Sequence, residues 1–377
     1  MYGSRLLSRA LSLSTMERML IGRAVAAALA QSWHPVPPPL SLRPHLLAEV
    51  SALLQRTGGA ALLWRRLPED LHRDDQTAEL HQAFRHHRLQ HVLRERNIIE
   101  AITFLRSAGI QPLLAKGWAI ARLYPEKGLR PFGDIDLLVR PEQYRRASAL
   151  LSEPGAPQCC VDLHEEFREL RDRTVQQLFD RSRKVVLNEL PILVLGPEDQ
   201  LRHCCLHMLA DGMWRPLWLC DVALLLESIS SDFDWDLCLA GDRTRAKWIT
   251  CSVGLARTLL HADISAFPLH REALNLPRWL VPAVLHQWGK KEHYMHGDPM
   301  SVRAAKPKTL LKGLQLRWPN PIQATVCTGG PFNEAPRLPF QIAECVRRGT
   351  NFIREVHRNK TVAAGPTAPA RENANTG

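Results

Sequence analysis

The sequence predicts an α+β protein in which a small sheet is embedded in a mostly helical body. Two observations support this fold class. Most of the 377 residues show apolar side chains at helical spacing, whereas residues 110–167 alternate short apolar strands with short helices. The apolar fraction of 45% is enough for a sizeable core.

The N-terminal part is expected to be helical in two blocks. Residues 1–43 predict a first helix over 1–32 and an extended proline-rich linker, because "HPVPPPL" at 34–40 cannot continue a helix. Four arginines and one glutamate in the first thirty residues resemble an organelle transit peptide, although an ordinary amphipathic helix is the preferred interpretation. Residues 44–109 return to helical period and end at Gly109, a residue typical of a helix C-terminus.

The period then changes, and residues 110–195 form the predicted core unit. A β-α-β-α-β order follows from short apolar runs separated by glycine and proline. The expected strands are 110–117, 132–139 and the start of 159–167, and the expected helices are 118–125 and 140–153. From residue 174 on, the pattern predicts mainly helix again.

Residues 196–360 are expected to be a helical C-terminal part, followed by a tail. "GPEDQLRHCCLHMLADGM" at 196–213 and "WRPLWLCDVALLLESI" at 214–229 read as two packed helices, and 341–360 as a last helix. Residues 361–377 lack large apolar side chains and are expected to be disordered.

Composition limits the functional classes. Nine cysteines without a CxxC motif favour reduced thiols in a cytoplasmic protein. The longest apolar run, at 19–30, is interrupted by Arg23 and is too short to span a bilayer. A net charge of +11 favours anionic partners, but no compact Lys/Arg run accompanies it, so nucleic-acid binding is only weakly supported.

Two aspartates in one predicted strand are the first candidate site. In "FGDIDLLV", Asp134 and Asp136 are two residues apart, so their side chains point to the same face, roughly 7 Å apart. Carboxylates on one face repel unless a cation lies between them. The pair therefore fits either divalent metal ions or a strand end exposed to water.

Residues before and after this pair extend the candidate site. Lys116 and Gly117 lie between a strand and a helix, where backbone N–H groups can approach phosphate oxygens, and Arg130 is four residues before the pair. Asp162, in "CVDLHEEF", is the candidate third carboxylate. It shares a face with His164 on the next strand, and Glu165 and Glu166 are the alternatives if that strand ends early.

The stretches "KGWAIARLYP", "GLRPFGDIDLLV" and "VDLH" resemble the uncharacterised nucleotidyltransferase family of bacteria, within the DNA polymerase beta superfamily. The likeness runs from about residue 44 to about residue 325. It implies a mixed sheet and a site with two Mg²⁺ ions, or Mn²⁺. By the same resemblance, Asp134 and Asp136 would ligate both ions, Asp162 would ligate the catalytic ion, and Gly117 would cradle the triphosphate.

The resemblance also implies the reaction. The chain would move a nucleoside monophosphate from an NTP to a hydroxyl of a small molecule, peptide, protein or RNA, and release pyrophosphate. The alternative is a catalytically decayed protein that binds a nucleotide or a partner on the same scaffold. Trp118 after Gly117, and an interval of only 25 residues between Asp136 and Asp162, favour this alternative.

A further group of residues comes from the C-terminal helices. His203 and His207 are four residues apart and share a helix face, so with Cys204 they suggest a zinc site, or simply packing. The resemblance instead implies that Asp199, His207 and Asp221 line the cleft or brace it.

Overall fold

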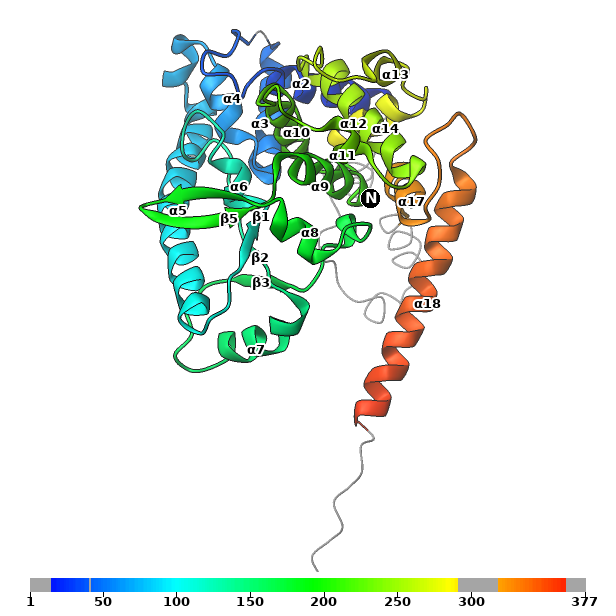
Figure 1. The fold of residues 1–377 in the computed structure, drawn as a ribbon. Coiled ribbons are helices and arrows are strands. Elements are labelled where there is room, and N and C mark those ends of the chain that lie inside the picture. Colours follow the sequence, from blue (N-terminus) through cyan, green and yellow to red (C-terminus); the bar gives the residue numbers. More distant parts are fainter. Residues whose placement is uncertain (1–14, 41, 291–317, 364–377) are drawn as a thin grey trace, which may run out of the picture.

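A five-stranded mixed sheet lies against a larger body of helices in the computed structural model (Figure 1), which confirms the predicted α+β class. The structure describes residues 15–40, 42–290 and 318–363. The first residues of the expected first helix and the tail from 364 on lie outside these ranges. None of the described helices has the length and apolar composition needed to cross a bilayer.

The sheet has the strand order β3-β2-β1-β5-β4. β2 pairs in parallel with β3, and β1 with β5, whereas β1 and β2 are antiparallel, as are β4 and β5. The sheet is therefore mixed, as the resemblance implied. The strands are β1 Leu113–Ala115, β2 Ile135–Leu138, β3 Val161–His164, β4 Arg183–Leu187 and β5 Leu190–Val194.

The β4–β5 hairpin is the part of the sheet that the sequence pattern did not indicate. Its strands lie in the region where helix was expected to dominate from residue 174 on. The connecting residues Asn188 and Glu189 have φ values of 44° and 70°. Two-residue hairpin turns with positive φ at both positions usually use Asn-Gly, and the glutamate here removes that signal.

The helices before the sheet follow the predicted order. α2 (Thr15–Leu29) is followed by α3 (Pro44–Thr57) and α4 (Ala60–Arg66), where one helical block was expected. Gly58, with φ of 83°, ends α3 and divides the block. A 3₁₀ turn η1 (Glu69–Arg73) then leads into the long α5 (Asp75–Ser107), and Gly109 follows with φ of 74°.

Short helices connect the strands, and a second group of helices completes the body. The connecting elements are α6 (Gly117–Ala121), α7 (Pro141–Leu151), η2 (Arg168–Leu170) and α8 (Val175–Asp180). The C-terminal helices are α9 (Pro197–Ala210), α10 (Leu217–Glu227), α11 (Trp235–Leu239), α12 (Arg243–Leu260), α13 (His270–Leu274), α14 (Leu280–Trp288), α17 (Pro321–Cys327) and α18 (Leu338–Ala363). Figure 1 shows α18 extending away from the rest of the molecule.

One hydrophobic core joins both ends of the described chain. It contains buried residues of α2, α3 and α4 together with residues of α9, α10, α12 and α14. Two smaller cores lie on the faces of the sheet. The helical body is thus built from segments before and after the sheet, and the sheet is an insertion between them.

Alternation along the strands decides which face of the sheet carries the polar residues. Leu114, Leu137 and Val139 pack with α5 and α7 on one face. Leu113, Ala115 and Leu138 pack on the other face with residues of η2 and α8. Because successive side chains in a strand point to opposite faces, Asp136 lies on the same face as Leu138, toward η2 and α9.

The contact between α2 and α14 generates a stability prediction. A Cβ atom at Gly22 would lie 2.0 Å from the carbonyl oxygen of Leu285, so the two helix backbones touch at this glycine. We expect Gly22→Ala to lower the free energy of unfolding by about 3 kcal/mol, measured by urea denaturation, because backbone must move to admit the methyl group.

Gly349 in α18 is the matched control. A Cβ atom there would meet nothing within 4 Å. Gly349→Ala should leave stability unchanged or raise it by up to about 1 kcal/mol through helix propensity. Equal denaturation curves for both variants would contradict close packing of α2 on α14.

Candidate functional site

Asp136, Asp162 and His164 meet where β2 and β3 run side by side. The parallel register pairs Asp136 directly with Asp162, and Leu138 with His164. Nε2 of His164 lies 3.1 Å from Oδ1 of Asp136 and 3.2 Å from Oδ2 of Asp162. One ligand atom from each of the three residues lies within 4.8 Å of the others, a spacing that could hold a metal ion.

Lys116 joins this cluster from the neighbouring strand. Ala115 at the end of β1 is paired with Asp136, so the next residue begins the turn beside the carboxylate. Nζ of Lys116 donates to Oδ1 of Asp136 at 3.1 Å. Lys116 has φ of 51°, which is uncommon for a residue with a side chain and is typical of strained functional turns.

Asp136 remains ionised despite its burial. Its side chain is 12% exposed, and burial alone would raise the pKa of its carboxyl group. The hydrogen bond from His164 and the charge of Lys116 outweigh burial, so the pKa of Asp136 lies below its usual value. A charged carboxylate is the form that binds a cation.

Asp162 and Asp134 are more open to solvent than Asp136. The side chain of Asp162 is 58% exposed. Asp134 is exposed and directly precedes β2, and its carboxylate is not among the three ligand atoms grouped within 4.8 Å in the described chain. The structure therefore brings Asp136 and Asp162 together and leaves the part of Asp134 in the site a prediction.

The turn after β1 explains how Trp118 fits beside Gly117. Gly117 has φ of 31°, and a Cβ atom there would lie 3.5 Å from the carbonyl oxygen of Asp134. The indole of Trp118 is buried and packs in the core between the sheet and α5, where its Nε1 donates to Glu95 at 3.0 Å. The indole is therefore held by α5, on the face opposite to Asp136.

Arg130 and Asp221 form a buried ion pair, and contact of Arg130 with a phosphate stays a prediction. Nη2 of Arg130 lies 2.8 Å from Oδ2 of Asp221, and its Nε lies 3.2 Å from Oδ1. The hydroxyl of Tyr124 donates to the same carboxylate at 2.9 Å. Both charged side chains are at most 6% exposed. They connect the loop before β2 to α10, which supports the bracing alternative for Asp221.

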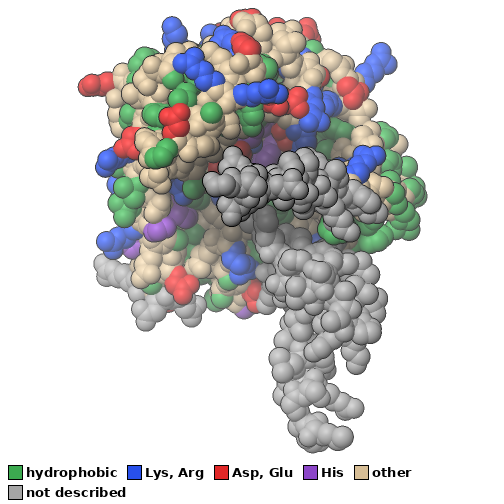
Figure 2. Space-filling view, turned by 90° about the horizontal axis from the view of Figure 1, so that it is seen from below, with side chains coloured by type: hydrophobic (Ala, Val, Ile, Leu, Met, Phe, Trp, Pro, Cys, Tyr) green, Lys and Arg blue, Asp and Glu red, His purple; other side chains and the backbone are tan. Residues whose placement is uncertain are grey.

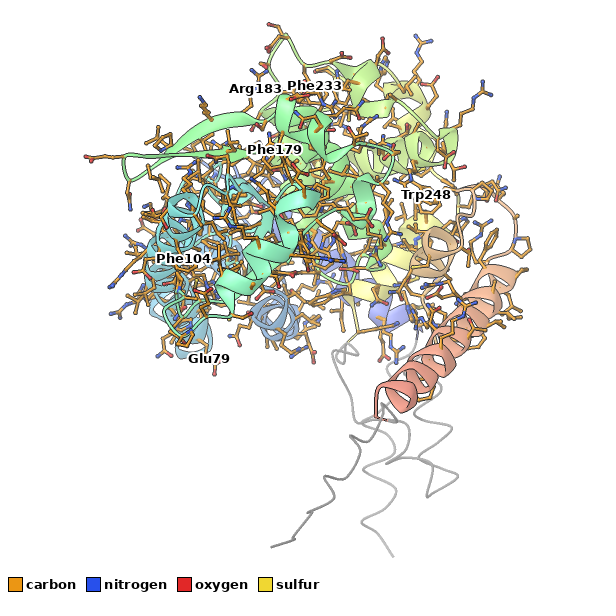
Figure 3. All side chains as sticks on the ribbon, turned by 60° about the horizontal axis from the view of Figure 1, so that its bottom comes forward. Glu79, Phe104, Phe179, Arg183, Phe233 and Trp248 are labelled. Atoms are coloured by element: carbon orange, nitrogen blue, oxygen red, sulfur yellow. The ribbon has the colours of Figure 1, made fainter. Side chains whose placement is uncertain are left out.

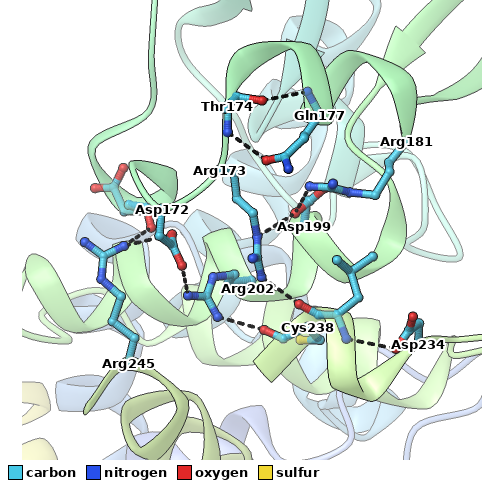
Figure 4. Close-up of polar contacts among 12 residues, drawn as sticks. Asp172, Arg173, Thr174, Gln177, Arg181, Asp199, Arg202, Asp234, Cys238 and Arg245 are labelled. Carbon is cyan, nitrogen blue, oxygen red and sulfur yellow. Dashed lines mark hydrogen bonds and ion pairs between the residues drawn. The ribbon is translucent and has the colours of Figure 1, made fainter. Parts of the chain in front are cut away.

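Asp199 has a similar bracing position (Figure 4). Its carboxylate accepts from Nε and Nη2 of Arg181 at 2.9 and 3.1 Å, and Nε of Arg173 lies 3.6 Å from it. Asp199 is 1% exposed. It connects α9 to both ends of α8, so it brings the helical body against the sheet.

A second group of metal-type ligands lies next to the first. Glu169 from η2 meets His203 and His207 from α9, with one ligand atom from each within 4.8 Å of the others. The Phe167 ring lies between the groups, 5.0 Å from the ring of His164 and 4.8 Å from that of His203. The helical spacing predicted the two histidines together, but no sequence signal pointed to Glu169.

The chain matches a known protein family over the region that contains these residues. A family model described as an uncharacterised nucleotidyltransferase matches residues 47–262, which is more than half of the chain. The chain belongs to the uncharacterised nucleotidyltransferase family. Searches of curated proteins and of solved structures gave no match. The matched range includes the whole sheet and both ligand groups, and it ends before the predicted limit near residue 325.

The two ligand groups are separate from a cavity beside the β4–β5 hairpin. That cavity has a volume of about 320 Å³ and lies between the β-hairpin and α10. Arg183 and Phe233 both line it and lie close together in Figure 3. Its lining includes none of the carboxylates or imidazoles of the two groups. The candidate chemistry therefore lies outside this cavity.

The Arg130–Asp221 pair gives a test of bracing. Asp221→Ala leaves the Arg130 guanidinium buried without its counter-charge, so we expect a loss of about 3–5 kcal/mol in the free energy of unfolding. Tyr124→Phe removes one hydrogen bond to Asp221 and should cost about 1 kcal/mol. Urea denaturation of both variants measures the difference.

A residue that only lined the nucleotide cleft would give another result. Asp221→Ala would then weaken nucleotide binding and leave the denaturation midpoint unchanged. That outcome would contradict the bracing role of the ion pair.

Proposed function

We propose that this protein transfers a nucleoside monophosphate from an NTP to a hydroxyl group, with two Mg²⁺ or Mn²⁺ ions held by Asp136, Asp162 and Asp134. The observation that carries the proposal is the register of β2 and β3. It sets Asp136 and Asp162 side by side, next to the Lys116–Gly117 turn on β1. Family membership supports a transferase of this type.

The residues present fit hard divalent cations. Asp136 and Asp162 supply carboxylate oxygens, which Mg²⁺ prefers, and the exposed Asp134 directly precedes β2. The structure compensates the charge of Asp136 with Lys116 and His164. When bound, the ions would neutralise charge on the phosphates and on the departing pyrophosphate.

Each residue around the proposed metal site has its own role in this proposal. Nζ of Lys116 lies 3.1 Å from Oδ1 of Asp136, and the Lys116 side chain is 22% exposed. Its ammonium group can therefore turn from the carboxylate toward a phosphate oxygen. Gly117 keeps the turn free of a side chain. Asp162 is the exposed carboxylate and is the candidate to orient the acceptor hydroxyl. Arg130 acts through Asp221 as a brace.

The acceptor is a hydroxyl on a small molecule, peptide, protein or RNA. Figure 2 shows the molecule from below the view of Figure 1. On the described part of this face, Lys and Arg side chains are interspersed with Asp and Glu and form no continuous basic band. A charge-driven RNA-binding surface would concentrate the basic residues. The surface in this view therefore does not favour RNA over the other acceptors.

A non-catalytic nucleotide-binding protein is the second candidate. The observation that favours it is the Lys116–Asp136 ion pair, which satisfies the carboxylate without a metal ion. Trp118 supports the non-catalytic candidate less than its position after Gly117 suggested. Its indole is buried against α5, so it does not crowd the turn at Gly117. The transferase should release pyrophosphate from an NTP when a suitable hydroxyl acceptor is present. The non-catalytic protein should release none with any acceptor in a broad panel.

The test uses Asp136→Asn, which removes one ligand charge at nearly constant volume. We expect wild-type protein to bind ATP or GTP more tightly with Mg²⁺ than without, and the variant to lose this dependence in calorimetry. Pyrophosphate release with a competent acceptor should fall at least about 100-fold, because charge stabilisation by metal is lost.

The matched control is Asp236→Asn, at an exposed aspartate of α11 far along the chain from the site. It should leave nucleotide binding and pyrophosphate release at wild-type values. Full pyrophosphate release by Asp136→Asn would refute the assigned site. Mg²⁺-dependent binding without release from any acceptor would support the non-catalytic candidate.

A further inference from the structure

The second ligand group contains a buried histidine without a polar partner. His203 is fully buried, and both of its ring nitrogens lack a hydrogen bond within the described chain. Its Nε2 lies 3.9 Å from Oε2 of Glu169, which is too long for a hydrogen bond. Buried polar groups are normally satisfied, so an imidazole left in this way indicates an absent ligand.

The neighbouring residues complete a three-ligand arrangement around that imidazole. Nδ1 of His207 lies 3.7 Å from Oε1 of Glu169, so both histidines face the same carboxylate. Ligand atoms around a tetrahedral zinc ion with bonds of about 2.0–2.1 Å lie roughly 3.4 Å apart. The two histidine–carboxylate distances, 3.9 and 3.7 Å, are close to this value, although they join different oxygens of Glu169, and the three ligand atoms as a set lie within 4.8 Å of one another.

A fourth residue supports His207 from outside the group. Its other nitrogen, Nε2, lies 3.6 Å from Oδ2 of Asp211, the residue directly after α9, so a small approach would form a hydrogen bond. Metal-binding histidines commonly direct their second ring nitrogen to a carboxylate, which fixes the ring orientation. Asp211 is in the position for that role, with Nδ1 of His207 left for the ion.

Cys204, which the sequence suggested as a third ligand, does not take part. Its Sγ accepts a hydrogen bond from Gln200, and it is not among the three ligand atoms grouped within 4.8 Å of one another in the described chain.

We propose that Glu169, His203 and His207 form a site for one divalent transition-metal ion of the zinc type, distinct from the carboxylate site of Asp136 and Asp162. Two imidazoles and one carboxylate suit Zn²⁺, whereas an all-oxygen set suits Mg²⁺. Three protein ligands leave one coordination position open. The proposal does not depend on nucleotidyl transfer.

The test uses Zn²⁺ itself as the probe on the full chain. The protein is stripped with a chelator, given Zn²⁺ with excess Mg²⁺ present, and analysed for bound metal and affinity by elemental analysis and competition with a chromophoric chelator. We expect one zinc ion per chain, with X-ray absorption showing imidazole ligands. Absence of stoichiometric zinc would overturn the proposal.

Variants locate the ion. His207→Gln and the isosteric Glu169→Gln should each weaken zinc binding by more than about 100-fold, and Asp211→Asn by about 10–100-fold, since a supporting carboxylate matters less than a ligand. Far-UV circular dichroism and a thermal melt establish that each variant folds. Glu169→Gln decides the matter if His207→Gln does not fold.

Asp136→Asn is the matched control, because the neighbouring carboxylate group also contains a histidine. It should leave zinc affinity unchanged. Loss of zinc in Asp136→Asn, with retention in Glu169→Gln, would place the ion at the carboxylate group and overturn the proposal. Unchanged affinity in all variants would show binding elsewhere and would overturn it equally.

Discussion

The rest of the site depends on the burial of one ionised carboxylate in the middle of a strand. A buried charge is costly unless it is paired and hydrogen-bonded. Asp136 meets that condition through two neighbours from different strands, Lys116 after β1 and His164 at the end of β3. Both partners can be in place only if the three strands keep their register, since a shift by one residue would turn Asp136 to the face packed by α5. The strand register therefore places the polar residues of the site, and the need to pair the buried charge of Asp136 disfavours any other register.

This dependence explains which parts of the fold the sequence could predict. The strands carrying Asp136 and Asp162 were predicted because their period-2 pattern is local, and the convergence of the two carboxylates follows from parallel neighbours. The β4–β5 hairpin was not predicted from the sequence, because its turn residues Asn188 and Glu189 adopt positive φ without a glycine. Arg130 was expected near phosphates from its distance along the chain. Its ion-pair partner in the structure, Asp221, lies 91 residues further on, a separation at which no local pattern carries information.

The same reasoning applies to the second ligand group. Helical spacing predicts that His203 and His207 share a face, because residues four apart lie one turn apart. Glu169 comes from a 3₁₀ turn that follows β3, and only the packing of η2 on α9 brings it to the histidines. Phe167 lies between this group and His164, with an imidazole ring on either side of it. If both groups bind metal ions as proposed, two carboxylates and one imidazole in the first would favour a harder ion than one carboxylate and two imidazoles in the second.

The helical body contributes rigidity to this arrangement through buried ion pairs. Asp199 and Asp221 lie on consecutive helices of the body and each binds arginine from the sheet unit. Arg202 of α9 adds a further link, since it is fully buried and donates to Asp172 and to the carbonyl oxygen of Cys238 at 2.8 Å. Apolar packing alone would tolerate small sliding of the sheet against α9 and α10, because dispersion contacts have little directionality. Bidentate arginine–carboxylate pairs are directional and fix orientation as well as distance. The buried pairs thus hold the β2–β3 edge at a defined position over α9, which is the geometry that both ligand groups require.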